Sequence, residues 1–147
     1  MFDLLFVIIA ITFNLLIIGI FISGKRKRDK LRRWFGIVFV CLAIPLIIVF
    51  INYLIIGQEL WIIICLVIIL LYLFLELLLD LILKYDFRKK PITHVPYIIL
   101  FYIVSFSLIG ITFYIDEISG WIVSITFWAV LASLIYNLAG RKKKDNE

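Results

Sequence analysis

Residues 72–96 read YLFLELLLDLILKYDFRKKPITHVP. The segment begins inside a long apolar run, carries Glu76 and Asp80 within that run, and leaves it at Lys84 through a basic stretch that ends in two prolines. About 18 or more apolar residues in succession indicate a transmembrane helix, and Lys and Arg gathered at its end indicate a loop at the membrane surface. The stretch therefore predicts a membrane-spanning helix followed by a basic surface loop.

The composition extends this prediction to the whole chain of 147 residues. Hydrophobic residues make up 65% of it, whereas soluble domains contain about 45–50%, so the excess exceeds what one globular core can bury. We therefore expect an all-α polytopic integral membrane protein, a compact bundle within a single domain over residues 1–140, followed by a basic tail over residues 141–147. Five transmembrane helices are expected, over residues 2–23, 34–56, 61–84, 97–115 and 121–139.

The distribution of charge predicts the topology. The net charge is +5, and all 15 Lys and Arg residues fall in three clusters, at residues 25–33, 84–90 and 141–144. The two remaining connections contain only the charges of Glu59, Asp116 and Glu117. Because positive charge favours the cytoplasmic side, we expect the N-terminus outside and the C-terminus inside. Each basic cluster adjoins a helix end, which favours a role in topology over nucleic-acid binding.

Proline and glycine predict where the helices bend and end. Pro45 lies midway along the second run and predicts a kink, because proline removes one backbone hydrogen bond. Pro91 and Pro96 bias their neighbours away from helix and predict an extended segment before the fourth span. Residues 116–120 are expected to form a turn, and Gly140 is expected to end the last helix.

Polar residues form a stripe along the third span. Tyr72, Glu76, Asp80 and Lys84 recur every four residues and so share one slanting helix face. An ionised carboxylate in the bilayer costs about 2.5–3.5 kcal/mol or more, so each acid must be protonated, paired or facing a protein interior. One interpretation is an intramembrane acidic site. The other is structural, with Asp80 paired to Lys84 and Glu76 hydrogen-bonded within the bundle.

A second candidate site is a contact surface at the cytoplasmic face. It comprises Asp86, Arg88, Lys89, Lys90 and His94. Near an anionic leaflet each Lys or Arg contributes about 1 kcal/mol of attraction, so the loop is expected to meet anionic headgroups, and it offers a docking surface for a partner. The single histidine lacks the spacing of a metal motif, which favours an interfacial residue over a ligand. We assign no metal site, cofactor or catalytic residue.

The fourth and fifth spans also carry polar residues at helical spacing. They are Tyr102, Ser105 and Thr112 on the fourth span and Thr126, Ser133 and Asn137 on the fifth. Such stripes favour close helix packing and interhelical hydrogen bonds over a solute path.

Three functions remain open from the sequence. The chain lacks a phosphate-binding glycine loop, a GxSxG motif and a paired CxxC, which favours a non-enzymatic accessory or interaction subunit of a larger membrane assembly. The second hypothesis is a proton- or cation-coupled transporter or channel that uses Glu76 and Asp80 in an oligomer. The third is a lipid-binding or lipid-modifying protein at the cytoplasmic leaflet. We expect a multi-pass protein of the cell membrane whose partners are the bilayer and either another membrane protein or further copies of the chain.

Overall fold

The computed structural model describes residues 1–25, 29–78 and 91–142, and within these ranges its regular structure is entirely helical. The elements are α1 (Phe2–Lys25), α2 (Asp29–Cys41), α3 (Ala43–Ile56), α4 (Leu60–Glu76), α5 (Pro91–Ile115) and α6 (Glu117–Lys142). Four helical segments are long and apolar enough to cross a membrane: Phe2–Ser23, Arg33–Ile56, Val95–Ile115 and Glu117–Tyr136. The predicted class of all-helical membrane protein is therefore confirmed.

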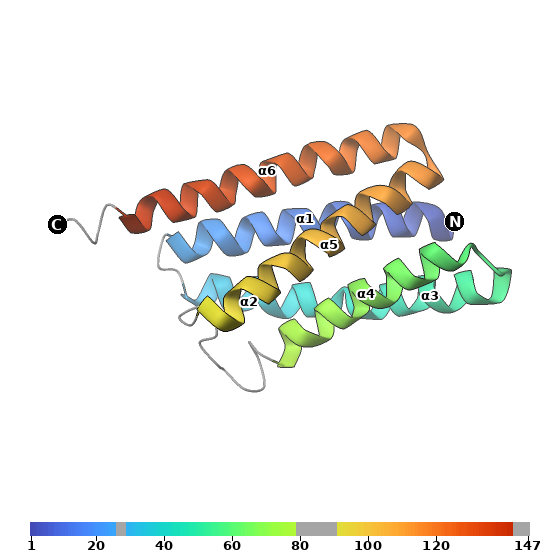
Figure 1. Ribbon diagram of the computed structural model, residues 1–147, viewed down its shortest axis with the longest axis horizontal. Helices are drawn as coiled ribbons and strands as arrows, with labels where there is room; N and C mark the ends of the chain where they lie inside the picture. The colour runs from blue at the N-terminus through green and yellow to red at the C-terminus, as the bar shows by residue number, and fades with distance from the viewer. Residues whose placement is uncertain (26–28, 79–90, 143–147) are drawn as a thin grey trace.

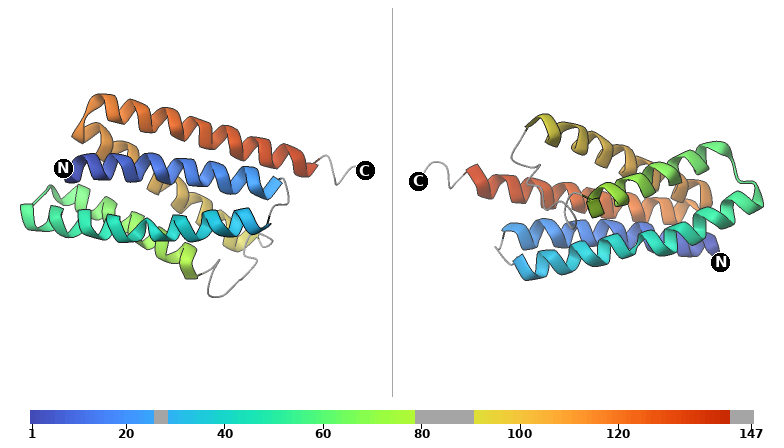
Figure 2. Two further views of the ribbon diagram at one scale, coloured as in Figure 1. Left: turned by 180° about the vertical axis from the view of Figure 1, so that it is seen from behind. Right: turned by 90° about the horizontal axis from the view of Figure 1, so that it is seen from below.

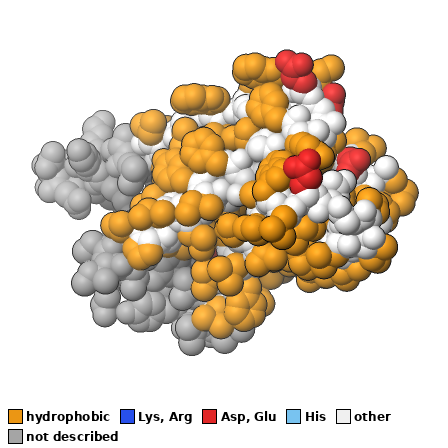
Figure 3. Space-filling view, turned by 45° about the vertical axis from the view of Figure 1, so that its right-hand side comes forward, with side chains coloured by type: hydrophobic (Ala, Val, Ile, Leu, Met, Phe, Trp, Pro, Cys, Tyr) orange, Lys and Arg blue, Asp and Glu red, His pale blue; other side chains and the backbone are white. Residues whose placement is uncertain are grey.

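The helices form a closed bundle in which α1 has the most neighbours (Figures 1 and 2). It packs against α2, α3, α5 and α6, while α4 lies between α3 and α5. The start of α1 and the α3–α4 and α5–α6 turns lie together at what we call the acidic end, which carries Asp3, Glu59, Asp116 and Glu117. Figure 3 shows acidic side chains gathered there among hydrophobic ones. The opposite, basic end carries Lys30 and Arg33 of α2.

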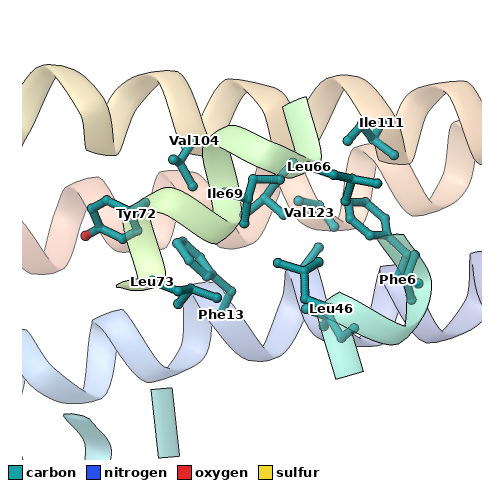
Figure 4. Close-up of a cluster of buried hydrophobic side chains, with 14 of the residues drawn as sticks. Phe6, Phe13, Leu46, Leu66, Ile69, Tyr72, Leu73, Val104, Ile111 and Val123 are labelled. Atoms are coloured by element: carbon teal, nitrogen blue, oxygen red, sulfur yellow. The ribbon is translucent and has the colours of Figure 1, made fainter. Parts of the chain in front are cut away.

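The core is filled by apolar side chains from every helix. Those that are almost completely buried include Phe6, Phe13, Leu46, Leu66, Ile69, Leu73, Val104, Leu108 and Ile111 (Figure 4). The outward surface is also largely apolar, and its large exposed side chains include isoleucines, leucines and tryptophans from all six helices. An apolar surface around a packed interior is what a bilayer requires, because lipid covers the surface that water would reject.

The helix is interrupted close to Pro45, where the sequence predicts a kink. The second apolar run is divided into α2 and α3 at Leu42, whose backbone N–H donates to the Phe39 carbonyl oxygen at 3.2 Å. Pro45 has no N–H for the Cys41 carbonyl, and its ring crowds that same carbonyl. Regular α-helix therefore ends at Cys41 and resumes at Ala43, after a single residue.

The prediction of an extended segment before the fourth span is wrong at residues 91–96. Helix α5 begins at Pro91 and contains Pro96. Proline is well suited to the first position of a helix, because its φ is already helical and no N–H is needed there. Pro96 removes one later hydrogen bond, a loss that membrane helices tolerate when neighbouring groups compensate.

The two connections at the acidic end are short: the first has the predicted length, residues 57–59, and the second is shorter than predicted. Gly57 adopts a left-handed conformation with φ of 73° and ends α3, so the chain reverses into α4 within a few residues. At the second connection only Asp116 is non-helical, and its carboxylate accepts hydrogen bonds from the N–H and hydroxyl of Ser119, each at 3.0 Å. This N-cap starts α6 at Glu117, so the turn predicted over residues 116–120 is wrong.

The last helix also extends further than predicted. Gly140 does not end α6, which continues to Lys142. A glycine weakens a helix interior by only about 1 kcal/mol relative to alanine, so it stops a helix only where the subsequent residues favour another conformation.

Candidate functional site

The carboxyl group of Glu76 lies in the interior of the bundle near the end of α4. The residue is 8% exposed and lies roughly 24 Å along the helix axis from Leu60. Immediately after it the helix widens, and Leu77 and Leu78 continue in π-helical conformation. Short π-helical turns occur frequently at functional sites. An acid of α4 is thus held within the protein at the basic half of the bundle.

Two tyrosine hydroxyls bind the same carboxylate oxygen. Tyr72, one turn earlier on α4, donates to Glu76 Oε1 at 3.2 Å, and Tyr97 of α5 donates to that oxygen as well. The two hydroxyl oxygens lie 2.8 Å apart, and the ring centroids lie 5.6 Å apart. Side chains from α4 and α5 therefore form a triangle of three oxygen atoms, which we call the Glu76 cluster.

The same three side chains of the Glu76 cluster can remain hydrogen-bonded whether the carboxyl group is ionised or protonated. With the carboxyl ionised, the two tyrosine hydroxyls supply two protons for the three described oxygen–oxygen contacts. With Oε1 protonated, three protons can occupy the three contacts in a cyclic arrangement, each oxygen donating once and accepting once. Hydrogen-bonded networks of this kind support proton binding in membrane proteins.

An aromatic layer covers the cluster on the side of the acidic end. The ring of Tyr72 lies 6.1 Å from Phe13 of α1, 6.2 Å from Phe39 of α2 and 6.3 Å from Phe101 of α5, measured between centroids. The rings of Phe13 and Phe39 also pack at 4.9 Å. Beyond this layer the interior is occupied by leucine, isoleucine and valine side chains (Figure 4). The Glu76 cluster thus lies on the side of the aromatic layer that faces the basic end.

The predicted acidic stripe is only partly within the described residues. Tyr72 and Glu76 lie together, as their spacing predicts. Asp80, Lys84, Asp86, Arg88, Lys89 and Lys90 lie outside the described residues. His94 belongs to the first turn of α5, but its side chain also lies outside the described part of the chain.

Sequence analysis missed Tyr97. Its position at the expected start of the fourth span, the next span along the chain after the one that carries Tyr72, was the available signal. A contact between α4 and α5 depends on how the two helices pack, and spacing along one chain does not contain that information.

A second polar contact joins α1 to α6 in the middle of the bundle. Asn14 is 1% exposed, and its Nδ2 donates to Thr126 Oγ1 at 2.8 Å and to the Val123 carbonyl oxygen at 3.3 Å. Its Oδ1 is buried and has no hydrogen-bond partner among the described residues. In α5, Ser105 and Thr112 are buried and bond to carbonyls of their own helix. Of the polar residues predicted to join helices, Thr126 makes a hydrogen bond to another helix, whereas Ser105 and Thr112 bond within α5.

The described residues offer no cluster of three His, Cys, Asp or Glu side chains that could hold a metal ion. Cys41 and Cys65 are free thiols.

Fold and site together define an all-helical membrane protein with a buried, tyrosine-bound carboxyl group. Beyond this class the comparisons identify no relative. No protein-family model matches the chain. No curated protein and no solved structure is significantly similar to it.

Proposed function

We propose that the chain is a non-enzymatic interaction subunit of a larger assembly in the cell membrane. The observation that carries this proposal is the filled interior. Between the aromatic layer and the acidic end, the core is occupied by side chains such as Leu46, Leu66 and Ile111, each at most 1% exposed. Transport or catalysis within a single chain needs space for a solute beside its reactive groups. A packed bundle with short connections is better suited to holding a partner.

We propose five membrane spans, with the N-terminus outside and the C-terminus inside. Helix α4 has 17 residues, about 25 Å, and extension of the apolar run to Lys84 supplies the remaining length of a span. With five spans, all three basic clusters fall on one side, as the distribution of charge in membrane proteins favours. The acidic end then faces outward.

The surface proposed for the partner is the cytoplasmic segment that joins α4 to α5. The proposed contact residues are Asp86, Arg88, Lys89 and Lys90 of this segment and His94 in the first turn of α5. A partner that binds here also adjoins the Glu76 cluster, because that cluster lies near the ends of the two helices that the segment joins. Anionic headgroups would strengthen the contact without defining its specificity.

Purification from native membranes in lipid nanodiscs, followed by native mass spectrometry, tests the proposal. We expect a stoichiometric partner that is lost when Lys89 and Lys90 are both replaced by Ser. The matched control replaces Lys143 and Lys144 of the tail by Ser, which removes the same charge and should leave the complex intact. A chain that is recovered alone, as a monomer or homo-oligomer, contradicts the proposal.

The Glu76 cluster supports a second candidate function, a proton- or cation-coupled transporter that is assembled from several copies. A buried carboxyl that two hydroxyls bind is suited to taking up and releasing a proton. Because the described core between the aromatic layer and the acidic end is filled, the path would run between copies. Flux into proteoliposomes should then disappear in Glu76→Gln and Asp80→Asn, whereas flux that persists in both variants excludes this function.

A further inference from the structure

A separate group of side chains lies at the acidic end, outside the Glu76 cluster. Glu59, at the N-cap position of α4, accepts a hydrogen bond through Oε2 from Trp61 Nε1 at 2.5 Å. Its Oε1 accepts from the hydroxyl of Tyr114, near the end of α5, at 3.3 Å. The rings of Trp61 and Tyr114 are nearly perpendicular, at 84°, with centroids 5.5 Å apart. The α3–α4 turn and the end of α5 thus build one site from two aromatic rings and a carboxylate.

The three side chains remain open to their surroundings. Trp61 is 38% exposed, Tyr114 is 50% exposed, and Glu59 is also exposed. The two connections at this end, residues 57–59 and residue 116, contain no Lys or Arg. Each carboxylate oxygen has a second lone pair beyond the hydrogen bond it already accepts. The site therefore presents negative charge and aromatic surface with capacity for a further donor.

This chemistry selects an ammonium group. A cation is attracted to the face of a Trp or Tyr ring within about 6 Å of its centroid, and a neighbouring carboxylate adds charge and hydrogen-bond acceptors. A quaternary ammonium can use the rings alone, because it has no N–H. A primary ammonium can use both the rings and the free lone pairs of Glu59.

The position of the site indicates the source of the ammonium group. Trp and Tyr concentrate at the depth of lipid headgroups, and Trp61 and Tyr114 lie where α4 begins and α5 ends. We propose that Glu59, Trp61 and Tyr114 bind the primary ammonium headgroup of a phospholipid, phosphatidylethanolamine, in the leaflet at the acidic end. Lipids surround the protein at high local concentration, so a modest preference suffices to enrich one of them.

Native mass spectrometry of the full chain released from nanodiscs tests the proposal. The nanodiscs contain equal amounts of phosphatidylethanolamine, phosphatidylcholine and phosphatidylglycerol with the same acyl chains. The wild type should retain phosphatidylethanolamine about three- to tenfold more than phosphatidylcholine, as expected for an exposed ion pair combined with a cation–π contact. Phosphatidylcholine is the informative competitor, because its net charge is the same but its headgroup cannot donate a hydrogen bond.

Glu59→Gln should abolish the preference, and Glu117→Gln should leave it unchanged. Glu117 is the matched control, because it is an exposed acid at the same end. Trp61→Leu provides a second variant that keeps the carboxylate and should lower the enrichment; folding of each variant is checked by circular dichroism. Equal retention of the two zwitterionic lipids by the wild type, or equal effects of the two Glu variants, overturns the proposal. Retention of added free ethanolamine in place of the lipid overturns the assignment to a headgroup.

Discussion

Among the described residues, two of the buried polar contacts that join helices differ in what they can do. Asn14 joins α1 to α6 through Thr126, and Glu76 joins α4 to α5 through Tyr97. Both residues are at least nine-tenths buried. An amide has the same charge at every physiological pH, whereas a carboxyl can gain or lose a proton. The first contact can only hold helices together, while the second can also respond to its surroundings.

The two contacts also differ in how their polar atoms are hydrogen-bonded. Asn14 leaves its Oδ1 without a partner in the described structure, so its contact is only partly satisfied. In the Glu76 cluster a single oxygen, Oε1, is bound by two hydroxyls. The membrane interior makes unsatisfied polar groups costly, so the unpartnered Oδ1 of Asn14 should weaken that contact. Tyr72 belongs to both the Glu76 cluster and the aromatic layer, so the packing of Phe13 against its ring also holds the cluster in place.

The largest expected effect on stability comes from removing the ring of Phe13 from the aromatic layer. Phe13→Ala leaves a cavity beside Phe39 and Tyr72 and should destabilise the protein by about 3–5 kcal/mol. The free energy of unfolding can be measured by SDS titration in mixed micelles. Phe106→Ala is the control, because that ring is 61% exposed and should cost much less. Equal losses in the two variants would show that the layer is not a packed unit.

The sequence was sufficient to predict where the apolar helices lie along the chain, but not the residues at which some of them begin and end. Apolar runs located the helices, because lipid tolerates few alternatives to a hydrogen-bonded helix, and Pro45 located the interruption. Pro91 was misinterpreted because proline both ends and begins helices, and the choice depends on the residues that come after it. Residues 117–120 were misinterpreted because the side chain of Asp116 caps α6.

The candidate site was predictable to the extent that it lies on one helix. The spacing of Tyr72 and Glu76 placed them on one face, and the structure brings them together. Tyr97 and the pair of Asn14 with Thr126 come from helices far apart in sequence. Such contacts are set by helix packing, which a single sequence does not specify.

A smaller effect is expected from placing a charge in the neutral contact. Asn14→Asp keeps the size of the side chain but removes the donor to Thr126 and introduces a carboxylate in mid-bundle. At neutral pH it should destabilise the protein by about 2.5–3.5 kcal/mol. Asn14→Leu, which removes the buried unpartnered oxygen together with the donor, should change stability by about 1 kcal/mol or less. If Asp and Leu at position 14 give equal stability, the bundle interior tolerates a carboxyl group without specific partners. The burial of Glu76 would then be no evidence that its hydrogen bonds are needed.

The smallest expected effect gives the sharpest comparison, because it measures the coupling within each contact. A double-mutant cycle of Tyr97→Phe and Glu76→Gln should give a coupling free energy of about 1–2 kcal/mol, since one partner is a carboxyl group. The parallel cycle of Asn14→Leu and Thr126→Val should give about 0.6 kcal/mol, the usual value for neutral hydrogen bonds between membrane helices. Both cycles use the same unfolding assay, so systematic errors cancel in their difference. Equal coupling free energies would mean that the Glu76 cluster only packs helices together, as the Asn14 contact does. A role for the carboxyl group would then have to come from contacts with the residues that follow α4.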